Sequence, residues 1–325
     1  MKRKIFKILL YTLLGIILLI TGSLIYIKLA LPNVGPAPDI KVEGTVAQLE
    51  RGEYLSNHVM VCMQCHSKRD FTLFAAPSIP GTSGMGGEIH DQRLGLPGKY
   101  VSTNLTPYEL SDWTDGEIFR AITTGVNKEG KALFPIMPHH NFGKLDENDI
   151  KAVIAYLRKL QPIEFDTEPS YSDFPMNFIV NFIPQKASLK SAPPKTNKIE
   201  YGKYLVTAGS CYDCHTIQKE GKVIGPDFGG GFEFTLEDGS VVRSANLTPH
   251  PTGIGNWSAQ QFVQRFKMYA DSNYRPVKVN PGDFQTVMPW NTYAGMTEDD
   301  LLAIYEYLST IALADNYVNR FTSSK

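Results

Sequence analysis

The sequence predicts a mainly α-helical protein in which one membrane-spanning helix precedes two tandem copies of a small helical domain. Three observations support this: an uncharged apolar run at residues 8–27, a set of motifs shared by residues 49–163 and 199–315, and an amphipathic helix pattern that ends each copy. With 325 residues, 42% of them hydrophobic and 20% charged, the chain has the length and composition of a folded two-domain protein.

Residues 1–31 are predicted to be a membrane anchor. A helix over the uncharged residues 8–27 spans about 30 Å, the thickness of the hydrocarbon core of a bilayer. Basic residues cluster at 2–7, so we expect a cytoplasmic N-terminus and place the rest in the periplasm of a bacterial inner membrane. The alternative is a cleaved signal peptide, which usually has a shorter apolar core and a small-residue cleavage site that does not follow here.

The net charge of the whole chain is -1, and no clustered basic face of the kind that binds nucleic acid is evident after the anchor. We therefore expect no nucleic-acid partner. Residues 32–48 are interpreted as a linker from the anchor to the first copy.

The two copies share motifs in the same order. Each contains a Gly-x-Tyr-Leu segment, Cys-x-x-Cys-His, Asn-Leu-Thr-Pro, a tryptophan and Met-Pro. A capping box follows each tryptophan, at residues 114–117 and 258–261, and predicts a helix start. Asp146 and Thr297 then cap a last helix with an i, i+3, i+4, i+7 apolar stripe.

Proline-rich residues 164–198 are interpreted as a linker between the copies. Its apolar piece, Phe174 to Pro184, is expected to pack against a domain, with contact to a membrane surface as the alternative. Residues 316–325 are expected to be a tail.

Cys-x-x-Cys-His is typical of covalent haem c attachment, because two thiols meet the two vinyl groups and the imidazole reaches the iron from the same turn. A redox dithiol would need no histidine, and a zinc site would need more closely spaced cysteine pairs. All four cysteines lie in these motifs. We therefore predict two haem c groups, attached at Cys62, Cys65 and His66 and at Cys211, Cys214 and His215.

Met137 and Met288 are the predicted second iron ligands, opposite His66 and His215. Each precedes a proline and stands nine residues before the cap of the last helix. A thioether opposite histidine is a known haem ligation. His139 and His140 compete with Met137, but the second copy has Trp290 and Asn291 at those places.

As a set, these motifs resemble the multihaem cytochrome c subunits of membrane-bound alcohol and gluconate dehydrogenases. The resemblance implies a class I cytochrome c fold for each copy, and it assigns the same haem ligands, including Met137 and Met288. Those subunits usually carry three such domains, whereas this chain has two, and its anchor is N-terminal.

The expected function is electron transfer by a membrane-anchored dihaem protein, from a dehydrogenase or quinol-linked donor to an oxidase or cytochrome acceptor. With both irons saturated by protein ligands, we expect a carrier rather than an enzyme. The alternative is a dihaem peroxidase, which needs one open iron position. A haem sensor would need a signalling domain, and the segment before the anchor is only a few residues long.

Overall fold

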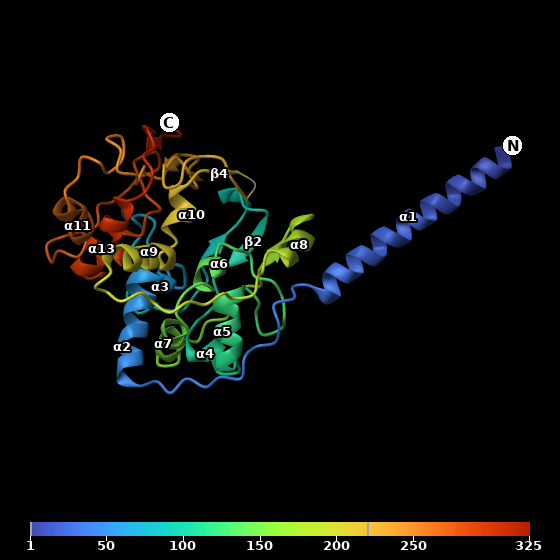
Figure 1. Cartoon of the computed structure of the whole chain (residues 1–325), viewed down its shortest axis with the longest axis horizontal. Helices are drawn as coiled ribbons and strands as arrows, with labels where there is room; N and C mark the ends of the chain where they lie inside the picture. Colours follow the sequence, from blue (N-terminus) through green and yellow to red (C-terminus); the bar gives the residue numbers. More distant parts are fainter. Residues whose placement is uncertain (1, 220) are drawn as a thin grey trace.

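A computed structural model describes residues 2–219 and 221–325 of the chain. Helix α1 (Lys2–Ala30) buries none of its residues and projects away from the rest of the molecule (Figure 1). Among the described residues it is the one helix that is long and apolar enough to cross a membrane. This matches the predicted anchor in position and length. The remaining elements form one body.

The two copies, called here repeat 1 (residues 49–163) and repeat 2 (residues 199–315), contain the same main helices in the same order. In repeat 1 these are α2 (Val46–Tyr54), α3 (Cys62–Cys65), α5 (Asp115–Thr124), α6 (His139–Phe142) and α7 (Glu147–Leu157). In repeat 2 they are α9 (Lys198–Ala208), α10 (Cys211–His215), α11 (Ala259–Lys267), α12 (Trp290–Tyr293) and α13 (Glu298–Leu308). Repeat 1 has one further short helix, α4 (Pro107–Leu110).

The predicted helix caps are confirmed. Thr114 with Glu117, and Ser258 with Gln261, form reciprocal capping boxes at the starts of α5 and α11. The side chain of Asp146 caps α7, and that of Thr297 caps α13. These four starts are encoded locally, since each side-chain oxygen accepts a hydrogen bond from a backbone N–H two or three residues later.

In each repeat the first helix crosses the last helix at a glycine. A Cβ atom on Gly52 of α2 would stand 1.9 Å from the carbonyl oxygen of Ala152 in α7. A Cβ atom on Gly202 of α9 would stand 1.9 Å from the carbonyl oxygen of Ala303 in α13. Only glycine therefore allows the backbones to approach this closely.

A π-helical turn, η1 (Leu55–Val59), follows α2, whereas α9 continues as a regular helix to Ala208. Repeat 1 has one residue more than repeat 2 between the shared Tyr-Leu pair and the first cysteine. A π-turn takes up one extra residue without ending the helix. The insertion is thus absorbed locally, and the motif after it keeps its place.

Small antiparallel sheets complete each repeat, and the sequence did not predict them. Strand β2 (Gly98–Val101) pairs with β1 (Ile89–His90) and with β3 (Tyr171–Ser172). Strand β7 (Val241–Arg243) pairs with β6 (Glu233–Thr235) and with β8 (Phe321–Thr322). A separate hairpin joins β4 (Gln218–Lys219) to β5 (Lys222–Val223).

Two predicted connections are therefore more ordered than expected. β3 lies in the proposed linker, and it joins that segment to repeat 1; the linker also contains α8 (Met176–Ile179) and a 3-10 turn at Val180–Phe182. β8 lies in the proposed tail and joins that segment to repeat 2. Strand pairing between residues so far apart leaves no local signal in a short segment, which is why both were missed.

The core extends through both repeats as one cluster of buried apolar residues. The predicted stripes of α7 and α13 lie in it, including fully enclosed Ile150, Ile154 and Leu301. Helices of both repeats stand next to one another in the body (Figure 1).

Candidate functional site

The two Cys-x-x-Cys-His segments form the same short helical turn, in α3 and α10. Each turn follows a residue in the left-handed conformation, Val61 with φ +52° and Ser210 with φ +53°. For a β-branched residue such as Val61 this conformation is a true outlier and costs about 1–3 kcal/mol. Val61 and Ser210 are different residue types, yet both adopt the left-handed conformation at the same place in their repeats. The backbone geometry at the start of the cysteine motif is therefore the same in both.

Both motif histidines make the same hydrogen bond. Nδ1 of His66 lies 2.7 Å from the carbonyl oxygen of Thr103, and Nδ1 of His215 lies 2.7 Å from that of Ala245. A carbonyl oxygen only accepts, so Nδ1 carries the proton in both rings. Among the described residues no hydrogen bond engages Nε2 of either ring. Nε2 therefore carries the lone pair that can bind a metal. Metal-binding histidines are commonly oriented by this kind of hydrogen bond from Nδ1 to a carbonyl.

Those two carbonyls are held by the Asn-Leu-Thr-Pro motifs that follow them. Oδ1 of Asn104 accepts from the backbone N–H of Thr106 at 2.9 Å, and Nδ2 of Asn104 donates to the carbonyl of Ile163 at 2.8 Å. Asn246 makes the equivalent bonds to Thr248 and Ala314. The motif thus fixes the loop that orients the histidine, which is the physical reason for its presence in both repeats.

A glycine in each repeat brings the chain back against the histidine. Gly86 and Gly230 both have φ +72°, and their N–H groups donate to the carbonyls of His66 (3.0 Å) and His215 (2.8 Å). A Cβ atom at either glycine would stand within 2.5 Å of backbone atoms of the loop that carries Thr103 or Ala245. Sequence reasoning missed these glycines, although the Gly-Met-Gly-Gly segment at 84–87 and the three glycines at 229–231 were a visible signal.

The cysteines do not resemble a redox dithiol. Burial raises the pKa of Cys62 to about 12, that of Cys65 to about 11 and that of Cys211 to about 12. A reactive dithiol has a lowered thiol pKa instead. No disulfide joins any of the four cysteines, and the described residues contain no group of three or more His, Cys, Asp or Glu side chains that could hold a metal ion. The donor set therefore fits two thioethers and one imidazole per site better than a zinc site.

Burial also lowers the pKa of His66 and His215, so both rings are neutral at neutral pH. A neutral imidazole is the form that binds a metal.

Met137 and Met288 occupy matching positions. Both are half-buried and pack against the core cluster, and each accepts a 2.8 Å backbone hydrogen bond, from His139 and from Trp290 respectively. The prolines after them start α6 and α12 with nearly the same dihedral angles. The two methionines thus stand in one local conformation, as the repeat predicts.

The two competing histidines differ: among the described residues Nε2 of buried His139 has no hydrogen-bond partner, whereas His140 pairs with an aspartate. His139 is 1% exposed and its ring packs against Gly125 at the end of α5, where a Cβ atom would stand 2.5 Å from Nε2. Burial lowers the pKa of His139 to about 4. Nε2 of His140 instead lies 3.1 Å from a carboxylate oxygen of Asp213, in the second cysteine motif.

Each Met-Pro helix contacts the cysteine motif of the other repeat. In α6, Nδ2 of Asn141 donates to Asp213 at 2.8 Å, between Cys211 and Cys214. In α12, Oγ1 of Thr292 donates to Oε1 of Gln64 at 2.7 Å, between Cys62 and Cys65. The two candidate sites are therefore linked crosswise.

Two further side chains strengthen this link. The ring of His58 is half-buried and bonds through Nδ1 to the carbonyl of Thr292 at 3.0 Å. Burial raises the pKa of Tyr293 well above its usual value, and the nearby thiols of Cys211, Cys214 and Cys65 add to this effect. Tyr293 is thus close to cysteines of both motifs.

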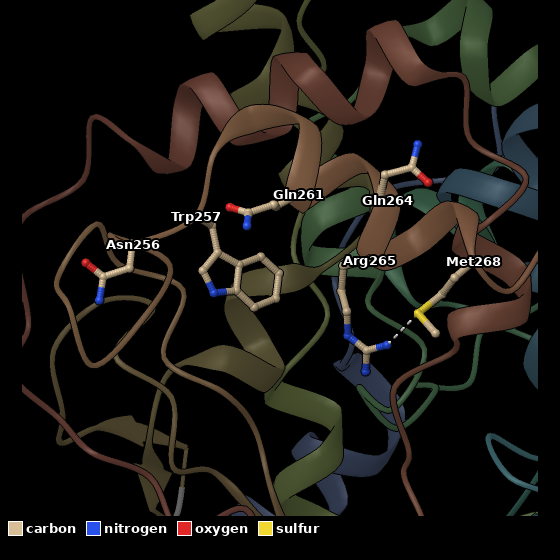
Figure 2. Close-up of a pocket in the computed structure, with 6 residues that line it drawn as sticks. All are labelled: Asn256, Trp257, Gln261, Gln264, Arg265 and Met268. Carbon is tan, nitrogen blue, oxygen red and sulfur yellow. Dashed lines mark hydrogen bonds between the residues drawn. The ribbon is translucent and has the colours of Figure 1, made fainter.

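A hollow on the surface of repeat 2 is separate from the predicted haem ligands. It is open and shallow, and Figure 2 shows Trp257, Arg265 and Met268 along it, with Arg265 donating to Sδ of Met268 at 3.2 Å. None of the predicted ligands lines it. The predicted ligands are buried or half-buried apart from Cys214, so the candidate site is in the interior and not in this hollow.

Comparison with known proteins supports a haem protein. Residues 199–312 match the family model for cytochrome c, so this part of the chain is a cytochrome c domain. The chain is also homologous to cytochrome c subunits of alcohol and gluconate dehydrogenases over most of its length.

Three relatives illustrate this similarity. The cytochrome c subunit of a quinone-dependent alcohol dehydrogenase from Komagataeibacter europaeus is 29% identical over 286 residues, covering 82% of this chain and 56% of the relative. The cytochrome c subunit of gluconate 2-dehydrogenase from Pantoea cypripedii is 25% identical over 300 residues, covering 85% and 62%. A dihaem c-type cytochrome from Cereibacter sphaeroides is 26% identical over 274 residues, covering 77% and 81%. The chain thus spans a little over half the length of the dehydrogenase subunits.

Proposed function

We propose that this chain is a membrane-anchored electron carrier with two haem c groups, one in each of two tandem class I cytochrome c domains at residues 49–163 and 199–315. The observation that carries the proposal is the pair of equal hydrogen bonds from His66 and His215 to backbone carbonyls. This bond fixes the tautomer and the direction of an imidazole that ligates a metal through Nε2. It occurs in both repeats, which supports two haems.

The residues of each site have separable roles. Cys62 and Cys65, and likewise Cys211 and Cys214, hold the haem covalently, and the Asn-Leu-Thr-Pro loop aims the histidine. When bound, haem supplies a reversible one-electron couple between ferric and ferrous iron. Met137 and Met288 serve as the second ligands, and a thioether ligand favours the reduced iron.

This ligand set favours a carrier over a peroxidase. A peroxidase needs one exchangeable iron position, whereas the matched conformations of Met137 and Met288 favour the same closed coordination in both repeats. The relatives named above are cytochromes and dehydrogenase subunits, which agrees with electron transfer.

The electron donor that we propose is a dehydrogenase, because several relatives are named as cytochrome subunits of alcohol, gluconate or fructose dehydrogenases. A quinol-linked donor is the second candidate, and an oxidase or another cytochrome is the proposed acceptor. Helix α1 anchors the chain, and the basic residues at its start support a periplasmic body.

Haem counting tests the proposal. The purified full chain should contain two haems with the thioether pyridine haemochrome spectrum. Cys62→Ser should remove one covalent attachment, and Cys211→Ser the other. Tyr212→Phe is the matched control within the second motif and should keep both haems, because the Tyr212 hydroxyl bonds only to surface Asp227 among the described residues.

An unchanged haem content in Cys62→Ser would contradict the attachment role of this motif. A high-spin haem together with peroxide turnover by the wild-type chain would contradict the carrier function and favour the peroxidase.

A further inference from the structure

The segment from Phe174 to Pro184 contains no charged residue and exposes large apolar side chains. Phe174 is 81% exposed, Phe182 59% and Ile179 45%. Only Val180 and Pro184 in this segment are buried. Three of the seven large apolar side chains that we expected to pack against a domain, those of Phe174, Ile179 and Phe182, are therefore exposed instead.

The protein holds this segment firmly at both ends. Before it, β3 pairs with β2, and the N–H of Asp173 donates to the carbonyl of Pro97 at 3.0 Å. After it, the N–H of Ser188 donates to the carbonyl of Gly143 at 2.8 Å. The exposed side chains are thus presented by an anchored stretch of backbone.

The same segment contacts the end of α1. Nζ of Lys28 donates to the carbonyl of Asn177 in α8 at 2.7 Å, and it lies 4.9 Å from the centre of the Phe178 ring. Figure 1 shows α8 projecting from the body beside the end of α1 that is nearer the body. Lys28 is the first charged residue after the uncharged run of α1, so it marks where a spanning helix leaves the hydrocarbon core.

We propose that the α8 segment (residues 174–184) is a second membrane contact, in which Phe174, Ile179 and Phe182 enter the boundary between lipid headgroups and acyl chains. Exposed aromatic and aliphatic side chains on a short uncharged segment suit this layer. The contact of α8 with Lys28 puts the segment at the level of this boundary, which favours lipid over a protein partner as its occupant. Together with α1 it would hold the body at one orientation to the membrane. The proposal rests on α1 being the anchor and does not depend on haem.

Photo-crosslinking of the full chain tests the proposal. A benzophenone amino acid replaces Phe174 or Phe182, and the purified chain is placed in nanodiscs of phosphatidylcholine and phosphatidylglycerol. The control is the same replacement at Val46, which is 71% exposed and starts α2 on the side of the body away from α1 (Figure 1). By mass spectrometry we expect lipid adducts when the replacement is at position 174 or 182, and none when it is at position 46.

Equal adducts at 46 and 174, or none at 174, would overturn the proposal. So would adducts at 174 to another protein, and not to lipid, in native membranes. Carbonate extraction separates the premise from the inference. A chain released from membranes by carbonate has no anchor, whereas a retained chain without adducts at 174 has an anchor but no second contact. Far-UV circular dichroism checks that each replacement leaves the fold intact.

Discussion

At the scale of single residues, the two repeats match most closely where chemistry is expected. His66 and His215 make bonds of the same length to carbonyls that stand just before the Asn-Leu-Thr-Pro motifs. The side chains two residues after Met137 and Met288 differ: His139 packs against Gly125, whereas Trp290 stacks on Tyr269. The two histidines thus have the same hydrogen-bond geometry, whereas the side chains at positions 139 and 290 differ in identity and packing.

Replacing either predicted methionine ligand tests the second half of each site. Met137→Ala or Met288→Ala should abolish one low-spin His/Met signal in the near-infrared spectrum and leave the haem count at two, since attachment uses the cysteines. Met268→Ala is the control, because Met268 is 48% exposed and lies in the surface hollow. A variant whose spectrum equals that of the wild type would show that the replaced methionine is not a ligand.

Tyr54 and Tyr204 exchange hydrogen bonds between the repeats. The Tyr54 hydroxyl donates to Asp300 at 2.7 Å, and the Tyr204 hydroxyl donates to Asp149 at 2.6 Å. Both aspartates are buried, and each also pairs with a cation, Asp149 with Arg51 and Asp300 with Lys195. Losing the tyrosine donor therefore removes one charge-assisted hydrogen bond from each aspartate. Tyr54→Phe or Tyr204→Phe should each lower the free energy of unfolding by about 1.5–3 kcal/mol, measured by denaturant titration.

Tyr108→Phe is the matched control for these variants. Its hydroxyl also donates to an aspartate, Asp166, at 3.1 Å, but this pair is exposed and its removal should cost nothing measurable. Equal losses in Tyr108→Phe and Tyr54→Phe would contradict the role of the buried pairs.

The same tyrosines predict how stability changes with pH. Burial, followed by the nearby aspartate, raises the pKa of Tyr54 and of Tyr204 above the usual value. Above about pH 10 the unfolded chain loses a phenol proton that the folded chain keeps, so rising pH favours unfolding, by about 1.4 kcal/mol per pH unit for each tyrosine. Below that pH their contribution is fully present.

Denaturant titrations between about pH 8 and about pH 11 measure this effect, because that range extends from about two units below to about one unit above the usual phenol pKa. The double variant Tyr54→Phe with Tyr204→Phe should show a shallower loss of stability above pH 10. An unchanged slope in this variant would mean that other groups cause the loss.

At the scale of elements, each repeat depends on one close helix crossing, α2 with α7 and α9 with α13. The repeated Gly-x-Tyr-Leu segment has two purposes here. Its glycine allows the crossing within a repeat, and its tyrosine reaches the last helix of the other repeat.

Gly52→Ala and Gly202→Ala test the crossing. Alanine in place of glycine at an unstrained helix position usually stabilises a protein by up to about 1 kcal/mol. Here the new Cβ atom would meet a backbone oxygen at 1.9 Å, so we expect a loss of about 1–3 kcal/mol in the free energy of unfolding. A stabilised variant in thermal or denaturant unfolding would show that the helices are not so close.

At the scale of the whole molecule, the repeats are interleaved and not strung along the chain. Cross-repeat bonds connect α2 to α13, α9 to α7, α6 to the second cysteine motif and α12 to the first. One continuous apolar core lies beneath them. Because each repeat supplies part of the other's surroundings, the two cysteine motifs are held next to each other.

This interleaving predicts a single cooperative unfolding transition for the body. Far-UV circular dichroism and haem absorbance should give coincident denaturant curves, since neither repeat has a separate core. Two resolved transitions, one for each repeat, would contradict a shared core. The double variant Tyr54→Phe with Tyr204→Phe should lower the midpoint and keep one transition.

How much the sequence predicts depends on the distance over which each feature is encoded. Thr114, Ser258, Asp146 and Thr297 cap their helices through neighbours within three residues, so these helix starts were predicted correctly. Strands β3 and β8 pair with residues far away in the chain, and His58 gains its partner from the other repeat. No local pattern carries such information.

By itself, the sequence determined the apolar first helix, the two copies of one motif set, the caps of their main helices and the candidate haem ligands. These depend on periodicity, spacing and residue chemistry, which operate within a few residues or through direct repetition. Only the tertiary structure decided that the copies cross-link through Tyr54 and Tyr204, that Gly86 and Gly230 bring the chain against the histidines, and that α8 lies beside Lys28. Those contacts join residues from separate elements, and the packing of the whole chain sets which elements meet.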